Sequence, residues 1–164
     1  MRRALAPLIH PPAGQSPASR RAVLRALLLL TIATGKESIA AAATSPDYQV
    51  IVHPSNAMAT VDREFLADAF LKKTSRWPDG EALAPVDQRP DSAVRKAFSL
   101  DVLKRSVGAV RSYWTQRIFS GRDIPPPELD SDAKVVQFVA SRPGAVGYVA
   151  AGSDIKGTKA VVLR

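Results

Sequence analysis

Residues 86–98 read VDQRPDSAVRKAF and predict a strand end, a short loop and the first turns of a helix. Pro90 disfavours helical backbone angles at the residue before it, and Ser92 is a favoured N-cap residue. Apolar residues then recur at a helical spacing as far as Phe98. We therefore expect a helix that begins at Ser92 and runs to about residue 103.

The start of this predicted helix is a candidate anion site. A helix N-terminus presents unpaired backbone N–H groups and the positive end of the helix dipole. Arg89 and Arg95 both lie within one turn of it. The alternative interpretation is that Ser92 is a plain N-cap and that Arg95 lies on the solvent face of the helix.

The remaining elements are predicted from apolar runs, helix caps and turn residues. Strands are expected at 48–52, 82–86, 145–149 and 160–163, and further helices at Thr60, at Ser106 and at Asp130 or Ser131. The helix after Ser106 is expected to bury one face formed by Val107, Val110, Trp114 and Ile118. Strands that alternate with helices predict an α/β sandwich, in one domain covering residues 44–164.

Residues 1–43 have the three parts of an export signal. A basic region precedes an apolar run at 26–33, and the small residues at 40–43 offer Ala-x-Ala cleavage sites. The run is too short to span a bilayer, which takes about 20 apolar residues. The segment SRRAVLR at 19–25 resembles the twin-arginine export motif. We expect a periplasmic protein whose mature part spans no membrane.

The charge of the chain depends strongly on this leader. The whole sequence carries 23 Lys and Arg against 15 Asp and Glu, a net charge of +8. Residues 1–43 hold six of the basic residues and one acidic residue, so the other 121 residues carry 17 against 14, or +3. Such a mildly basic domain lacks the clustered positive face that nucleic-acid binding requires, so nucleic acid is not an expected partner.

Four blocks of the mature chain occur in the order found in a known family. They are VIVHPSN at 50–56, FLKKTSRWPDG at 70–80, SAVRKAF at 92–98 and RPGAVGYV at 142–149. Together they resemble the substrate-binding proteins of phosphate ABC transporters. The resemblance implies one lobe of the two-lobed type 2 periplasmic binding protein fold, a three-layer α/β sandwich, in which helix N-termini hold an oxyanion between the lobes.

The resemblance implies a site at the helix that begins with Ser92. The family sequence there is Ser-Gly-Thr-Arg, and this chain has Ser92, Ala93, Val94 and Arg95, so the glycine and the threonine hydroxyl are missing. We expect the Ser92 hydroxyl, the amides of Ala93 and Val94, and Arg89 or Arg95 to hold phosphate or a similar oxyanion. The expected partners are an ABC permease or another envelope protein, and a second copy in a homodimer.

The alternative function is a ligand-free interaction module of an envelope complex that retains the fold. Catalysis is not expected, because the mature chain contains a single histidine, His53, and has neither a Ser/His/Asp set nor a Walker-type phosphate loop. The chain contains no cysteine, which excludes thiol chemistry, disulfides and thiolate metal sites. No cofactor is expected.

Overall fold

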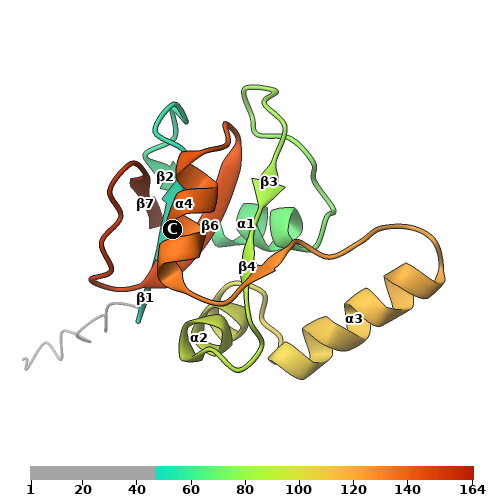
Figure 1. Ribbon diagram of the computed structural model, residues 1–164. Coiled ribbons are helices and arrows are strands. Elements are labelled where there is room, and N and C mark those ends of the chain that lie inside the picture. The colour runs from blue at the N-terminus through green and yellow to red at the C-terminus, as the bar shows by residue number, and fades with distance from the viewer. Residues whose placement is uncertain (1–46) are drawn as a thin grey trace, which may run out of the picture. The chain divides into compact units, whose positions relative to one another are not determined.

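A computed structural model describes residues 47–164 of the chain (Figure 1). The predicted export signal at 1–43 lies outside the described residues. The strands are β1 (Tyr48–Val52), β2 (Thr60–Val61), β3 (Ala84–Pro85), β4 (Asp87–Gln88), β5 (Glu128–Leu129), β6 (Ala145–Ala150) and β7 (Lys159–Leu163). The helices are α1 (Arg63–Phe70), α2 (Ala93–Asp101), α3 (Val107–Phe119) and α4 (Asp132–Ala140).

Five of the strands form one mixed sheet, in the order β2-β7-β1-β6-β3. The central strand β1 is antiparallel to both neighbours, with Val50 opposite Tyr148 of β6 and Val161 of β7. β4 and β5 form a separate parallel pair, in which Asp87 lies opposite Glu128. β4 connects β3 to the start of α2, and its pairing with β5 positions the predicted site.

The alternating side chains of β1 and β6 separate two apolar layers. Val50 of β1 and Tyr148 of β6 belong to a core that α1, α2 and α3 cover. Ile51 of β1 and Val149 of β6 belong to a second core, on which α4 packs through its buried valines. Helices therefore cover both faces of the sheet, and the expected three-layer α/β sandwich is confirmed.

The predicted caps at Ser92 and Ser106 are confirmed, and of the two candidates Asp130 and Ser131 it is Ser131 that caps α4. The side chain of Ser92 accepts a hydrogen bond from the amide of Arg95, Ser106 accepts from Ala109, and Ser131 accepts from Lys134. Each cap satisfies one of the amides that a helix start leaves unpaired. The predicted strands at 48–52, 145–149 and 160–163 are also observed, each within one residue of its expected ends.

Three predictions about local structure are wrong. Thr60 does not cap a helix, because it pairs with Val162 of β7 and Asp62 becomes the N-cap of α1. The strand expected at 82–86 is reduced to Ala84–Pro85, since Pro85 ends β3 at the sheet edge and the chain then pairs with β5 through β4. Ile118 is 50% exposed, because α3 extends away from the sheet and its second half lacks a neighbouring layer (Figure 1).

A hydrogen-bonded carboxylate on α2 connects that helix to β1 and α1. The Tyr48 hydroxyl donates to Asp101 Oδ2 at 2.6 Å, and Arg63 Nε lies 3.4 Å from the same oxygen. Burial acts to raise the pKa of Asp101, but the bond from Tyr48 and the charge of Arg63 outweigh it, so this pKa is lower than its usual value.

We expect Asp101→Asn to lower the free energy of unfolding by about 1 kcal/mol at neutral pH, since a charge-assisted bond becomes a neutral one. A carboxylate with a depressed pKa stabilises the folded state above its unfolded pKa, and this contribution is lost as the pH falls through the folded pKa. The difference between wild type and variant should therefore shrink below about pH 4 in urea unfolding curves. A constant difference between pH 7 and pH 2.5 would contradict this, and Asp154→Asn, in an exposed ion pair, is the control.

None of the helices within residues 47–164 is both long enough and apolar enough to cross a membrane.

Candidate functional site

The start of α2 is organised by Ser92 and Gln88. The Ser92 hydroxyl donates to Gln88 Oε1 at 2.8 Å and accepts from the amide of Arg95 at 3.3 Å. The amides of Ala93 and Val94 form no hydrogen bond to any other group within residues 47–164. Two backbone donors at the positive end of the helix are therefore available to an acceptor.

Gln88 holds this helix start against two other elements. Its side-chain amide donates to Tyr148 O of β6 at 2.9 Å and to Asp132 Oδ1 of α4 at 2.8 Å. The backbone of the preceding loop is fixed as well, because the amide of Arg89 donates to Leu129 O of β5 at 3.0 Å. The N-terminus of α2 is thus connected to β6, β5 and α4.

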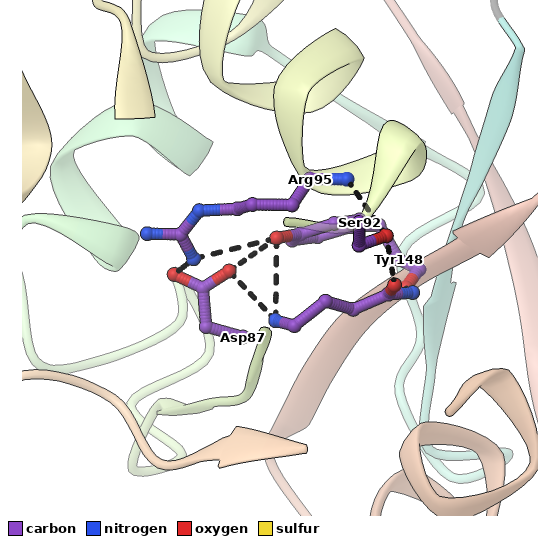
Figure 2. A network of polar contacts seen from close by, with 5 residues as sticks. Asp87, Ser92, Arg95 and Tyr148 are labelled. Carbon is purple, nitrogen blue, oxygen red and sulfur yellow. Dashed lines mark hydrogen bonds and ion pairs between the residues drawn. The ribbon is translucent and has the colours of Figure 1, made fainter. Parts of the chain in front are cut away.

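Arg95 points into the protein and not into solvent (Figure 2). It is 3% exposed, and its Nη1 forms an ion pair with Asp87, which is also 3% exposed. The Tyr148 hydroxyl donates to Asp87 Oδ1 and lies 3.4 Å from Arg95 Nη1. The ring of Phe98 stacks on that of Tyr148 with centroids 3.9 Å apart, so an aromatic layer covers one side of this network.

Burial determines the electrostatics of the network. It lowers the pKa of the Arg95 guanidinium and raises the pKa of the Tyr148 phenol. Tyr148 is therefore a neutral donor at physiological pH, while the charge of Arg95 is balanced by the carboxylate of Asp87. A buried charge is tolerated when it is paired in this way.

Arg89 has the opposite environment. It is exposed, and its Nε donates to Asp91 Oδ1 at 2.5 Å in a pair that is itself exposed. The bond from Arg89 holds the pKa of Asp91 below its usual value. An exposed ion pair of this kind contributes little to stability and can exchange partners.

The structure brings most of the predicted site residues together and separates one of them. Ser92, Ala93 and Val94 form the helix start, and Arg89 belongs to the loop before it. Arg95 contributes its amide to the cap, but its guanidinium is engaged inside the protein. The alternative interpretation is correct that Ser92 is an N-cap and wrong that Arg95 lies on the solvent face.

Asp87, Gln88 and Tyr148 were not predicted as partners of this site. One signal was present, because Arg95 stands three residues before Phe98 and therefore shares the buried face of α2. A carboxylate directly after the buried strand residue Val86 was a plausible counter-charge. The contribution of Tyr148 depends on strand register and could not be read from local sequence.

No family model and no curated protein sequence matches the chain. Solved structures do match it. An ABC-type phosphate transport receptor from Vibrio cholerae aligns with a TM-score of 0.55 and 17% identity, over 71% of this chain and 46% of that one. The chain has the fold of one lobe of a phosphate-transport binding protein.

Two further binding-protein structures agree with this assignment. A protein from Clostridium perfringens, described as a phosphate ABC transporter substrate-binding protein with bound phosphate, aligns with a TM-score of 0.56 and 16% identity, over 71% of this chain and 44% of that one. A phosphate-binding protein candidate from Planctomyces limnophilus aligns with a TM-score of 0.53 and 18% identity, over 72% and 41%. The chain therefore spans less than half the length of these binding proteins.

Proposed function

We propose that this chain is an exported binding protein that holds phosphate or a similar small oxyanion at the start of α2. The observation that supports this most strongly is the pair of unpartnered amides at Ala93 and Val94, on a fold shared with a phosphate-bound structure. Ser92 completes the site with a hydroxyl that can exchange Gln88 for the ligand. The leader at 1–43 supports export to the periplasm.

Arg89 supplies the cationic side chain of the proposed site. Its ion pair with Asp91 is exposed, so the guanidinium can turn to an anion without leaving a buried charge unpaired. Arg95 could do so only by leaving Asp87, whose side chain is 5% exposed. Arg95 is therefore expected to support the site indirectly, through the hydrogen bond that its backbone amide donates to the Ser92 hydroxyl.

A single open surface should bind weakly. A two-lobed protein encloses its ligand and excludes water, whereas one helix start faces solvent and screening ions. We expect a dissociation constant in the millimolar range, near −4 kcal/mol, for phosphate and the isolated chain. Tighter binding would require a second surface, from a second copy, an ABC permease or another envelope protein.

Calorimetric titration with phosphate and with sulfate tests this proposal. We expect Arg89→Ala to weaken phosphate binding about tenfold, because a charge-assisted hydrogen bond is lost. Lys156→Ala removes one positive charge from the exposed loop before β7 and is the matched control. Equal affinity of the wild type and Arg89→Ala for phosphate would contradict the proposal. The absence of any heat of binding at about 10 mM phosphate, which is above the expected dissociation constant, would contradict it as well.

A ligand-free interaction module is the second candidate function, and one observation favours it. The end of α3 and the loop after it expose Ile118, Phe119 and Ile124, which are 50%, 88% and 72% exposed. Exposed large apolar side chains that lie together on a surface are typical of docking sites, and these three are close in sequence. A chain that binds no anion in the titration, and that elutes as a dimer by light scattering, would support this function.

A further inference from the structure

A second candidate site lies between Arg95 of α2, helix α3, the segment that enters β5 and Pro90 of the loop before α2. It is a cavity of about 440 Å³, which is within the size range of small-molecule sites. Its apolar walls include Trp114 and Ile118 of α3 and Pro125 of the entering segment. None of these residues takes part in the hydrogen bonds at the start of α2.

Three charged side chains line the same cavity: Arg95, Arg111 and Glu128. Arg111 and Glu128 are exposed, and within residues 47–164 neither forms an ion pair. Arg95 uses Nη1 for Asp87, and its Nε is buried without a hydrogen-bond partner in the part of the chain that the structure describes. Figure 2 shows the other terminal nitrogen turned away from the network around Asp87.

Strand pairing relates the position of Glu128 to that of Arg95. Glu128 lies opposite Asp87 in the parallel pair of β4 and β5, and Asp87 binds Arg95. The position of Glu128 relative to the guanidinium is therefore set by strand pairing. Arg111 reaches the cavity from α3, on which Trp114 and Ile118 follow at helical spacings of three and seven.

The charges of the cavity sum to zero when Asp87 is counted. Arg95 and Arg111 are balanced by Asp87 and Glu128, so a simple anion that approached the arginines would also meet the carboxylate of Glu128. A ligand that carries both a negative and a positive group avoids this repulsion. A carboxylate on Arg111 and Arg95, an ammonium group on Glu128 and an apolar body against Trp114 would satisfy all the lining groups.

We propose that this cavity binds a small apolar amino acid, with its carboxylate on Arg111 and the free edge of Arg95 and its ammonium group on Glu128. The inference does not depend on the oxyanion function, because the two sites share only Arg95 and use different atoms of it. Phosphate, which lacks both an apolar body and a cationic group, is not a ligand of the cavity.

The test is calorimetric titration of the purified protein with three matched compounds. L-Phenylalanine carries both charges, 3-phenylpropionate lacks the ammonium group, and 2-phenylethylamine lacks the carboxylate. We expect phenylalanine to bind at least tenfold more tightly than either of the others, since each lost charge-assisted bond costs about one factor of ten. Equal affinity for phenylalanine and 3-phenylpropionate would overturn the proposal, and so would the absence of binding by all three compounds.

Two variants assign the roles of the charges. Glu128→Gln should weaken phenylalanine binding about tenfold, because it removes the partner of the ammonium group. It should strengthen 3-phenylpropionate binding, because it also removes the charge that repels a carboxylate on the arginines. Arg111→Gln should weaken the binding of both carboxylate compounds and should not weaken the binding of 2-phenylethylamine, whose ammonium group Arg111 repels. Both side chains are exposed, so the fold should be retained. If Glu128→Gln leaves the preference for phenylalanine over 3-phenylpropionate unchanged, the assignment is wrong.

Two further variants serve as controls. Thr115→Trp places a large side chain in the cavity wall and should abolish binding of phenylalanine without changing the response to phosphate. Arg122→Gln removes an arginine that does not line the cavity, and it should bind all three compounds as the wild type does. Phenylalanine binding that survives Thr115→Trp would place the ligand elsewhere and overturn the proposal.

Discussion

Replacement of Arg95 by alanine is expected to lower the free energy of unfolding by about 3–5 kcal/mol, the usual cost of removing one partner of a buried ion pair. Asp87 would lose its counter-charge in an environment where its side chain is 5% exposed, with Tyr148 as its remaining side-chain donor. The measurement is chemical denaturation at pH 7, followed by the fluorescence of the two tryptophans.

The matched control is Arg89→Ala, which removes an arginine from an ion pair of the same kind on the surface. Its unfolding midpoint should remain close to that of the wild type, because exposed pairs contribute little. Replacing both buried partners, as in Asp87→Asn with Arg95→Met, should recover much of the loss, since no uncompensated charge remains. A loss below about 1 kcal/mol for Arg95→Ala would show that the pair is not an essential part of the fold.

Replacement of Gly144 by alanine is expected to cost about 3 kcal/mol, the sum of backbone strain and overpacking. Gly144 has a φ of 72°, which side chains rarely adopt, and an added Cβ would overlap the backbone carbonyl of Ala82. The carbonyl of Gly144 also accepts hydrogen bonds from Trp77 Nε1 at 2.9 Å and from the amide of Ala84 at 3.1 Å. Any shift that relieved the overlap would disturb both bonds.

Gly121→Ala is the matched control for this effect. Gly121 has a similar φ of 64°, but nothing lies within 4 Å of an added Cβ. Its replacement should therefore cost only the conformational strain, about 1 kcal/mol. Thermal and urea unfolding of the two variants separates the cost of backbone strain from the cost of overpacking. Equal losses of unfolding free energy in both variants would show that Ala82 can move aside without cost.

Much of the fold could be predicted because its local signals agree with its tertiary structure. The apolar run at 48–52 lies between prolines and becomes the central strand β1. Ser92, Ser106 and Ser131 each precede a run of helical periodicity and each caps a helix. These features depend on residues close in sequence, so a single chain reveals them.

The features that could not be predicted depend on contacts between distant parts of the chain. Thr60 is a good cap residue, but its pairing with Val162 decides its conformation. Ile118 follows the apolar period of α3, but no layer covers that part of the helix. In the site, the direction of Arg95 depends on Asp87 and Tyr148, which lie 8 and 53 positions away in the sequence. Arg95 could be recognised as a site residue from its sequence motif, but the direction of its side chain could be predicted only with knowledge of the strand register.

The place of β7 in the sheet has a consequence for how the chain folds. β7 lies between β1 and β2, so the strand closest to the C-terminus joins two strands from the beginning of the described chain. Until residue 163 has left the ribosome, β1 has one open edge and β2 has no partner. Contacts between such distant segments form late, because closing long loops costs entropy before any contact is gained. The sheet is therefore completed only after residue 163 has been synthesised, and the edges of β1 and β2 that β7 covers stay open until then.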